Sequence, residues 1–109
     1  MAWLVRDDEV LAPLEVATSV AARSRGLLGR DGIEGAILLQ PATSVHTLGM
    51  RFAIDVAYCD ADLVVLATTT MARNRLGRPR LRARRVIEAE AGAFGGWSLQ
   101  PGDRLSVRS

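Results

Sequence analysis

The chain has 109 residues, of which 49% are apolar and 24% charged, and its formal net charge is +2. This length fits one domain, 1–109, with the balance of an ordinary globular protein. It contains no run of about 18 apolar residues, which argues against a transmembrane helix. The first ten residues lack the basic and then apolar pattern of a secretory signal. We therefore expect a single domain in the cytoplasm.

The charge is unevenly distributed, because all 14 basic residues are Arg and half of them lie in one short strip. The members of this strip are Arg73, Arg75, Arg78, Arg80, Arg82, Arg84 and Arg85. No acidic residue occurs between Asp62 and Glu88. The rest of the chain carries seven Arg against 12 acidic residues, a net of −5. The sequence therefore predicts a mildly acidic domain with one basic strip.

The amino-terminal part of the chain predicts two strands, at residues 2–6 and 10–17, joined by a tight turn at 7–9. Pro13 lacks a backbone N–H, so we expect the second strand to lie at an edge or to carry a bulge. Because Cys59 is the only cysteine, it cannot form a disulfide within the chain.

Residues 19–28 are predicted to form the one helix. Ser19 or Thr18 is suited to cap its first amides. Gly29 is suited to end it in the left-handed conformation. Four residues fall on one face at helical spacing and are expected to face the core: Val20, Ser24, Leu27 and Leu28.

The second half of the chain predicts five more strands, at residues 36–40, 53–59, 63–71, 81–91 and 104–108. Residues 63–66 are apolar on both faces, which favours a central strand. In 81–91, Glu88 falls on the face that also carries Arg82, Arg84, Val86 and Glu90. The glycine-rich segment 92–97 is expected to be a loop. The predicted class is mainly β (α+β): a β-sandwich or barrel-like sheet of about six or seven short strands with one short helix.

Several pieces in fixed order resemble a known family. They are the helix end Arg25–Arg30, the apolar strand 37–39, the segment His46–Met50, the triplet Ile54–Val56, the segment 86–92 and the pair Gly102-Asp103. Over residues 10–107 the chain is similar to the "domain of unknown function 192" family of small bacterial and archaeal proteins. The resemblance implies a mainly-β domain with one helix and implies no established activity.

Asp55 is the acidic residue of greatest interest, because it stands in the middle of an apolar strand. A buried carboxylate must be paired or hydrogen-bonded. Its candidate partners are Arg25, Arg30 and Arg51, or the backbone amides of residues 43–49. We favour a structural clamp that ties the 43–49 turn to the helix end; the alternative is a binding-site acid.

His46 is the only histidine. A nucleophilic set of Ser44 or Cys59 with His46 is disfavoured, since neither nucleophile sits in an activating turn or beside an evident cation. One His and one Cys cannot close a zinc site. We predict no catalytic residue, no metal and no cofactor.

Three functions remain open. The first is a non-enzymatic binding or accessory domain for a small polar or anionic ligand or a protein segment. Its candidate residues are Arg25, Arg30, His46, Thr47, Met50, Arg51 and Asp55. The second is a hydrolase-like enzyme in which His46 is the general acid or base and Asp55 orients it. The third is contact with nucleic acid or an acidic protein through the strip Arg73–Arg85, whose alternative interpretation is a solvated edge.

Overall fold

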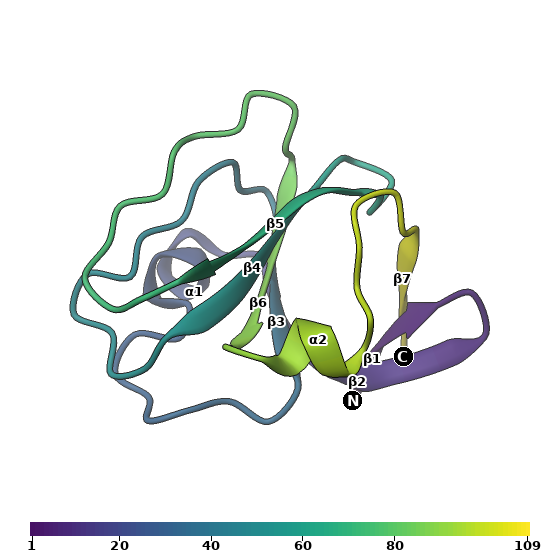
Figure 1. Ribbon diagram of the computed structural model, residues 1–109, viewed down its shortest axis with the longest axis horizontal. Helices are drawn as coiled ribbons and strands as arrows, with labels where there is room; N and C mark the ends of the chain where they lie inside the picture. Colours follow the sequence, from purple (N-terminus) through teal and green to yellow (C-terminus); the bar gives the residue numbers. More distant parts are fainter.

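The computed structural model describes all 109 residues and contains seven strands and two short helices (Figure 1). In chain order these are β1 (Ala2–Arg6), β2 (Glu9–Ala17), α1 (Val20–Arg25), β3 (Ala36–Leu39), β4 (Ile54–Cys59), β5 (Val65–Met71), β6 (Arg85–Glu90), α2 (Ala93–Gly96) and β7 (Leu105–Arg108). One sheet holds all seven strands in the order β5-β4-β6-β3-β2-β1-β7. The predicted mainly-β, barrel-like fold is confirmed.

The sheet curls until its two edges meet at one end. Just before β5 and β7, Val64 and Arg104 form an isolated antiparallel bridge. The N–H of Leu105 donates to the carbonyl of Leu63 at 2.9 Å, and the N–H of Val65 donates to the carbonyl of Asp103 at 2.8 Å. Because strands twist, a sheet of this width curls toward closure. The result is a half-barrel that is joined at this end.

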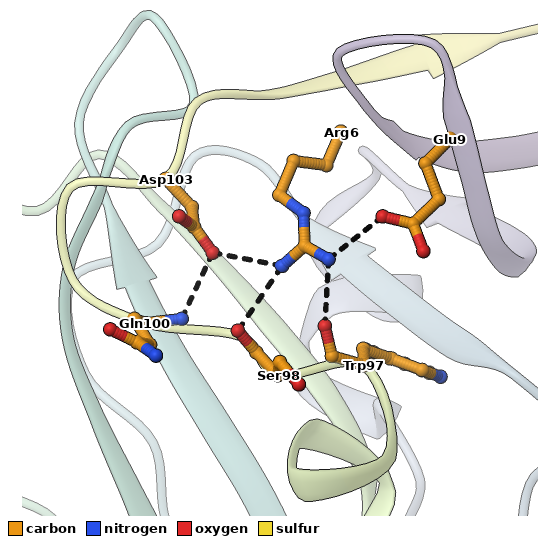
Figure 2. Close-up of polar contacts among 6 residues, drawn as sticks. All are labelled: Arg6, Glu9, Trp97, Ser98, Gln100 and Asp103. Atoms are coloured by element: carbon orange, nitrogen blue, oxygen red, sulfur yellow. Dashed lines mark hydrogen bonds and ion pairs between the residues drawn. The ribbon is translucent and has the colours of Figure 1, made fainter.

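Arg6 strengthens the same end of the half-barrel, as Figure 2 shows. From β1 its guanidinium donates to the carbonyls of Trp97 at 2.8 Å and Ser98 at 3.2 Å. It also pairs with the carboxylates of Glu9 at 2.9 Å and Asp103 at 3.0 Å. A planar guanidinium has enough donors to serve all four acceptors. Arg6 therefore ties the β1–β2 hairpin to the segment between α2 and β7.

Apolar side chains cover both faces of the sheet. One cluster includes Leu38, Ala57 and Ile87 and is covered by Phe94 of α2. The other includes Ile37, Val56 and Val86 and is covered by Leu27, which follows α1. Accordingly the two helices lie on opposite sides of the central strands (Figure 1). Burial on both faces explains why the central strands are almost uniformly apolar.

Four predictions about individual elements were wrong. The strand 63–71 is not central, because β5 is an edge strand. Its first residues are apolar because Leu63 and Val65 are buried where the half-barrel closes. Helix α1 ends at Arg25 rather than 28, because Gly26 takes φ +47°. Segment 92–97 contains the short helix α2, and residues 81–84 precede β6 as a loop.

Pro13 was expected to place its strand at an edge or a bulge. Strand β2 is interior, between β1 and β3, but its ladder with β1 carries a bulge, so the second alternative is confirmed. Its pairing with β3 begins only at Leu14, so Pro13 lies beside that ladder and not within it. Pro13 faces Trp3 of β1, one pair before the bulge between Leu4 and Val5. A missing N–H is tolerated at such a position.

Candidate functional site

A pocket of about 250 Å³ lies between the end of α1 and the 44–50 turn. Its walls combine the apolar side chains of Leu27, Leu39, Val45 and Met50 with several polar residues. These four side chains belong to the core on the α1 side of the sheet. The pocket is thus a hollow in the cover of that core, reached from the exposed end of the helix.

Glu88 lines this pocket and is its most unusual group. It stands on β6 opposite Ile37 of β3 and Val56 of β4, so its strand neighbours are apolar. Only 5% of its surface is exposed. None of the hydrogen bonds or ion pairs in the structure reaches its carboxylate. Burial raises the pKa of Glu88 to about 7, because it reduces the solvation of the charged form.

Gly26 brings the end of α1 close to this acid. A Cβ atom on residue 26 would lie 3.4 Å from Oε1 of Glu88, and φ +47° is a backbone conformation that glycine adopts most easily. Ser19 begins the helix as predicted, and its hydroxyl accepts the N–H of Ala22 at 3.1 Å. The end of the short helix therefore lies directly beside the carboxylate of Glu88.

Three basic side chains line the pocket: Arg23, Arg25 and His46. Arg23 is held by backbone carbonyls, those of Thr18 at 3.2 Å and Pro41 at 3.0 Å. Arg25 is exposed and has no acidic partner within ion-pair distance. Nδ1 of His46 accepts the N–H of Leu48 at 3.3 Å, which leaves the proton of the neutral ring on Nε2.

Of the seven binding candidates, the structure brings three together in this pocket: Arg25, His46 and Met50. Arg30 instead makes a two-bond ion pair with Glu15, at 2.6 and 3.1 Å. This hydrogen bonding is the main reason that the pKa of Glu15 is lowered. Arg51 is exposed and pairs with Asp31 at 3.1 Å. Neither arginine lines the pocket.

Thr47 has a structural position. Its fully buried hydroxyl donates to the carbonyl of Ala72 at 2.6 Å and accepts the N–H of Arg75 at 2.8 Å. Its backbone carbonyl accepts the N–H of Asn74 at 2.8 Å. Thr47 thus joins the 44–50 turn to the loop at 72–84, and the two segments run together in Figure 1.

Asp55 is buried as expected, but its predicted partners were wrong. Its carboxylate accepts the hydroxyl of Thr70 at 2.7 Å and the N–H groups of Gly92 at 2.9 Å and Phe94 at 3.1 Å. It therefore clamps β5 and the start of α2 to β4. The sequence did not predict α2, so the predicted partners of Asp55 did not include the amides of Gly92 and Phe94.

Asp55 also lies on the face of β4 opposite the pocket that holds His46. It does not orient that histidine. A more open groove of about 640 Å³ runs past Asp55, between Thr68–Thr70 of β5 and the segment 92–100. The Thr70 hydroxyl and the N–H groups of Gly92 and Phe94 already bind Asp55, so its carboxylate is satisfied without a ligand, unlike that of Glu88.

Glu88 is the residue that sequence reasoning missed. It was placed on the polar face of its strand, together with Arg82 and Arg84. The useful signal was its position in the run Val86-Ile87-Glu88-Ala89, since apolar residues on both faces are typical of a central strand. On such a strand both faces are covered, so an acid there is buried.

The basic strip is a loop over most of its length, not a strand. Residues 72–84, which we call the arginine loop, precede β6, so Arg80, Arg82 and Arg84 are not aligned along one strand face. None of the seven arginines of the strip takes part in the four ion pairs of the protein. Arg80 lies over the ring of Tyr58, 5.0 Å from its centre.

Two general features bear on the class of site. No three side chains of His, Cys, Asp or Glu lie close enough together to hold a metal ion. Neither helix has the length and apolar character needed to cross a bilayer.

Two solved structures share the fold. One is a protein of unknown function from Novosphingobium aromaticivorans, with TM-score 0.80 and 16% identity, over 96% of this chain and 82% of that one. The other is a putative transcription regulator from Sinorhizobium meliloti, with TM-score 0.81 and 18% identity, over 97% and 91%. At these identities the likeness shows the fold alone. No curated protein matches the chain.

The family profile described as DUF192, Uncharacterized ACR, COG1430, matches residues 3–107. This span is nearly the whole chain and agrees with the order of motifs seen in the sequence. The chain belongs to the DUF192 family.

Proposed function

We propose that this protein is a non-enzymatic binding domain that takes a small polar ligand in the Glu88 pocket. The observation that supports this most is Glu88, a largely buried side chain whose carboxylate has no donor within the protein and lines a hollow. Buried polar groups in folded proteins are nearly always satisfied. A ligand that supplies the donor would remove the cost of burial, and this gain becomes binding energy. We include a cytoplasmic location in the proposal; fractionation of the producing cells tests it.

A ligand-stabilisation screen tests the proposal, because any compound that binds the native state raises the melting temperature. The full chain is screened against small polar compounds, and hits are mapped by amide chemical shifts. Ser44→Trp places an indole at the exposed rim of the Glu88 pocket. Gln100→Trp does the same in the groove beside Asp55.

We expect hits to be lost in Ser44→Trp and kept in Gln100→Trp. The reverse pattern would assign binding to the groove and overturn the proposal. A screen whose hits shift no amides around the pocket would overturn it as well.

A second candidate function is contact with a polyanion through the arginine loop. Six of its arginines are exposed, and none is neutralised by an ion pair. Two exposed leucines lie in the same loop, Leu76 and Leu81, at 75% and 89% exposure. Unpaired arginines bind phosphates well because the guanidinium offers a planar pair of donors. No aromatic residue is interleaved, so the contact would be with the phosphate backbone and not with bases.

Fluorescence anisotropy with duplex and single-stranded DNA tests this second candidate. We expect binding at low salt with a slope of log K against log salt of about −4, as four or five phosphate contacts would give. The triple variant at Arg73, Arg75 and Arg78, each to Gln, should flatten the slope. A double variant at Arg104 and Arg108 is the control at the other edge of the sheet. No binding at low salt rules the candidate out.

A further inference from the structure

Glu88 is the only acidic residue that lines the pocket, whose other polar side chains are those of Arg23, Ser24, Arg25, Ser44 and His46. The apolar side chains of Leu27, Leu39, Val45 and Met50 also line it, and the acid's strand neighbours are apolar. No arginine or histidine nitrogen lies within ion-pair distance of the carboxylate. Any positive charge that pairs with Glu88 must therefore come from outside the chain. We infer that the ligand is a small organic molecule whose protonated amine lies against the Glu88 carboxylate; the inference rests on the proposed function.

An ammonium group fits this acid better than a neutral donor. A hydrogen bond with both partners charged is roughly twice as strong as one between neutral groups. Apolar surroundings weaken the screening of the pair, so the attraction is larger than at the surface. The chain itself supplies no opposite charge, so the ionised form of the acid costs free energy on folding. A bound amine supplies the missing charge and the missing donors together.

The opposite end of the ligand faces a different environment. Arg25 and His46 line the same pocket, and both are exposed to solvent. Arg25 has no acidic partner, and His46 carries its neutral-ring proton on Nε2. The two groups favour an anionic or strongly polar end. The volume of about 250 Å³ limits the molecule to a few carbon atoms between the two ends. The favoured ligand is thus a short amino acid with its amine inward.

The charged and titratable groups around Glu88 set the expected pH dependence. Arg23 and Arg25 belong to α1, His46 to the turn, and Tyr58 to β4, where Arg80 covers its ring. Burial raises the pKa of Glu88 to about 7. An aliphatic amine remains protonated across this range. Its binding should therefore ionise Glu88 and release a proton to solvent near neutral pH.

A matched set of three probes tests the inference: pentylamine, pentanoate and 5-aminopentanoate. Each is titrated into the labelled full chain, and the amide shifts of residues 26–28 and 45–50 are followed. We expect saturable shifts with pentylamine, tighter binding with 5-aminopentanoate and none with pentanoate. For pentylamine, the affinity should rise about tenfold from pH 6 to pH 8, as the ionised fraction of an acid of this pKa does.

Variants assign the effect to one acid. Glu88→Gln should abolish binding of both amines, whereas Glu90→Gln, an exposed residue of the same strand, should leave it unchanged. The variant His46→Gln should keep the pH dependence, since Glu88 causes it. If Glu88→Gln does not fold, the pH dependence of amine binding tests the inference instead. Affinity should rise from pH 6 to pH 8 in both the wild-type chain and His46→Gln.

The outcomes separate the inference from the proposed function. Pocket shifts with pentanoate alone would overturn the amine inference and leave the proposed function standing. Equal amine binding by Glu88→Gln, or affinity independent of pH, would overturn the inference as well. If no probe binds while the screen finds pocket ligands, the amine class is wrong and the pocket remains the site.

Discussion

A Cβ atom on Gly26 would lie 3.4 Å from Oε1 of Glu88, so the helix end and the central strand meet at this glycine and this acid. The positive φ of Gly26 turns the chain immediately after α1, and Leu27 then enters the core. The turn leaves a hollow above the carboxylate of Glu88 and places no hydrogen-bond donor there. The pocket is therefore a consequence of how a short helix ends over a buried acid.

Glu88→Gln should become more stable relative to wild type as the pH rises. Burial raises the pKa of Glu88 from 4.5 to about 7. Between these values the unfolded chain loses a proton that the folded chain retains. The stability contributed by the neutral acid is complete below about pH 4.5 and is lost by about pH 7. Glutamine does not titrate, so the difference between variant and wild type should grow by roughly 1–3 kcal/mol from pH 4.5 to pH 8.

Urea unfolding of both proteins at the two pH values measures this difference. Glu90→Gln is the exposed control, and its free energy of unfolding should equal that of wild type at both pH values. A difference between Glu88→Gln and wild type that stays constant with pH would show that Glu88 titrates normally in the folded protein.

Asp55→Ala should destabilise the fold strongly, because it leaves the Thr70 hydroxyl and the N–H groups of Gly92 and Phe94 without their acceptor. We expect a loss of about 2–4 kcal/mol, which lowers Tm by roughly 10–20 °C in a domain of this size. Thr70→Val removes one of the three bonds and should cost about 1 kcal/mol. Thermal unfolding followed by circular dichroism measures both, with the exposed Asp62→Ala as control. A folded Asp55→Ala protein with unchanged Tm would contradict the clamp.

Arg6→Lys should loosen the closed end of the half-barrel although it keeps the charge. A lysine ammonium cannot reach two carbonyls and two carboxylates as the guanidinium does. We expect a loss of about 1–3 kcal/mol for Arg6→Ala and a smaller loss for Arg6→Lys. Hydrogen exchange should increase at residues 97–105 in both variants. Arg108→Ala, an exposed arginine at the end of β7, should have no such effect; equal exchange in all three would argue against the clamp.

Cys59 should be unreactive in the native protein. Its side chain is fully buried, and burial together with the nearby charge of Asp60 raises the pKa of the thiol to about 12. Since the thiolate is the reactive form, a thiol reagent at pH 8 should label the chain only after unfolding. Labelling followed by mass spectrometry, with and without urea, measures this. Fast labelling of the folded chain would mean that β4 opens readily.

Much of the strand pattern was predictable from local residues. Alternation and turn residues located β1, β3, β4 and β7 to within a residue or two, because short strands between turns leave a clear local pattern. The end of α1 was harder to predict, because helix propensity alone does not show whether Gly26 or Gly29 ends the helix. The position of β5 at an edge was not predictable, because an apolar run is equally consistent with a central strand and with an edge that closes a half-barrel.

The candidate site was only partly predictable for the same reason. Arg25, His46 and Met50 were selected from the sequence, and the structure places them in one pocket. Arg30 and Arg51 resembled them in the sequence but have acidic partners elsewhere. Which arginine is paired depends on contacts between distant segments, such as Arg30 with Glu15 and Arg51 with Asp31.

The sequence by itself determined the family, the mainly-β class, the burial of Asp55 and the excess of arginine in the 73–85 strip. These depend on residue order and local pattern. Only the tertiary structure decided that Glu88 is a buried acid, that Asp55 clamps α2, and that the basic strip is a loop without ion pairs. The physical reason is that burial and pairing depend on which strands become neighbours. Glu88 lies between β3 and β4, which are far from it in the chain. Their apolar side chains bury an acid that would otherwise be expected at the surface.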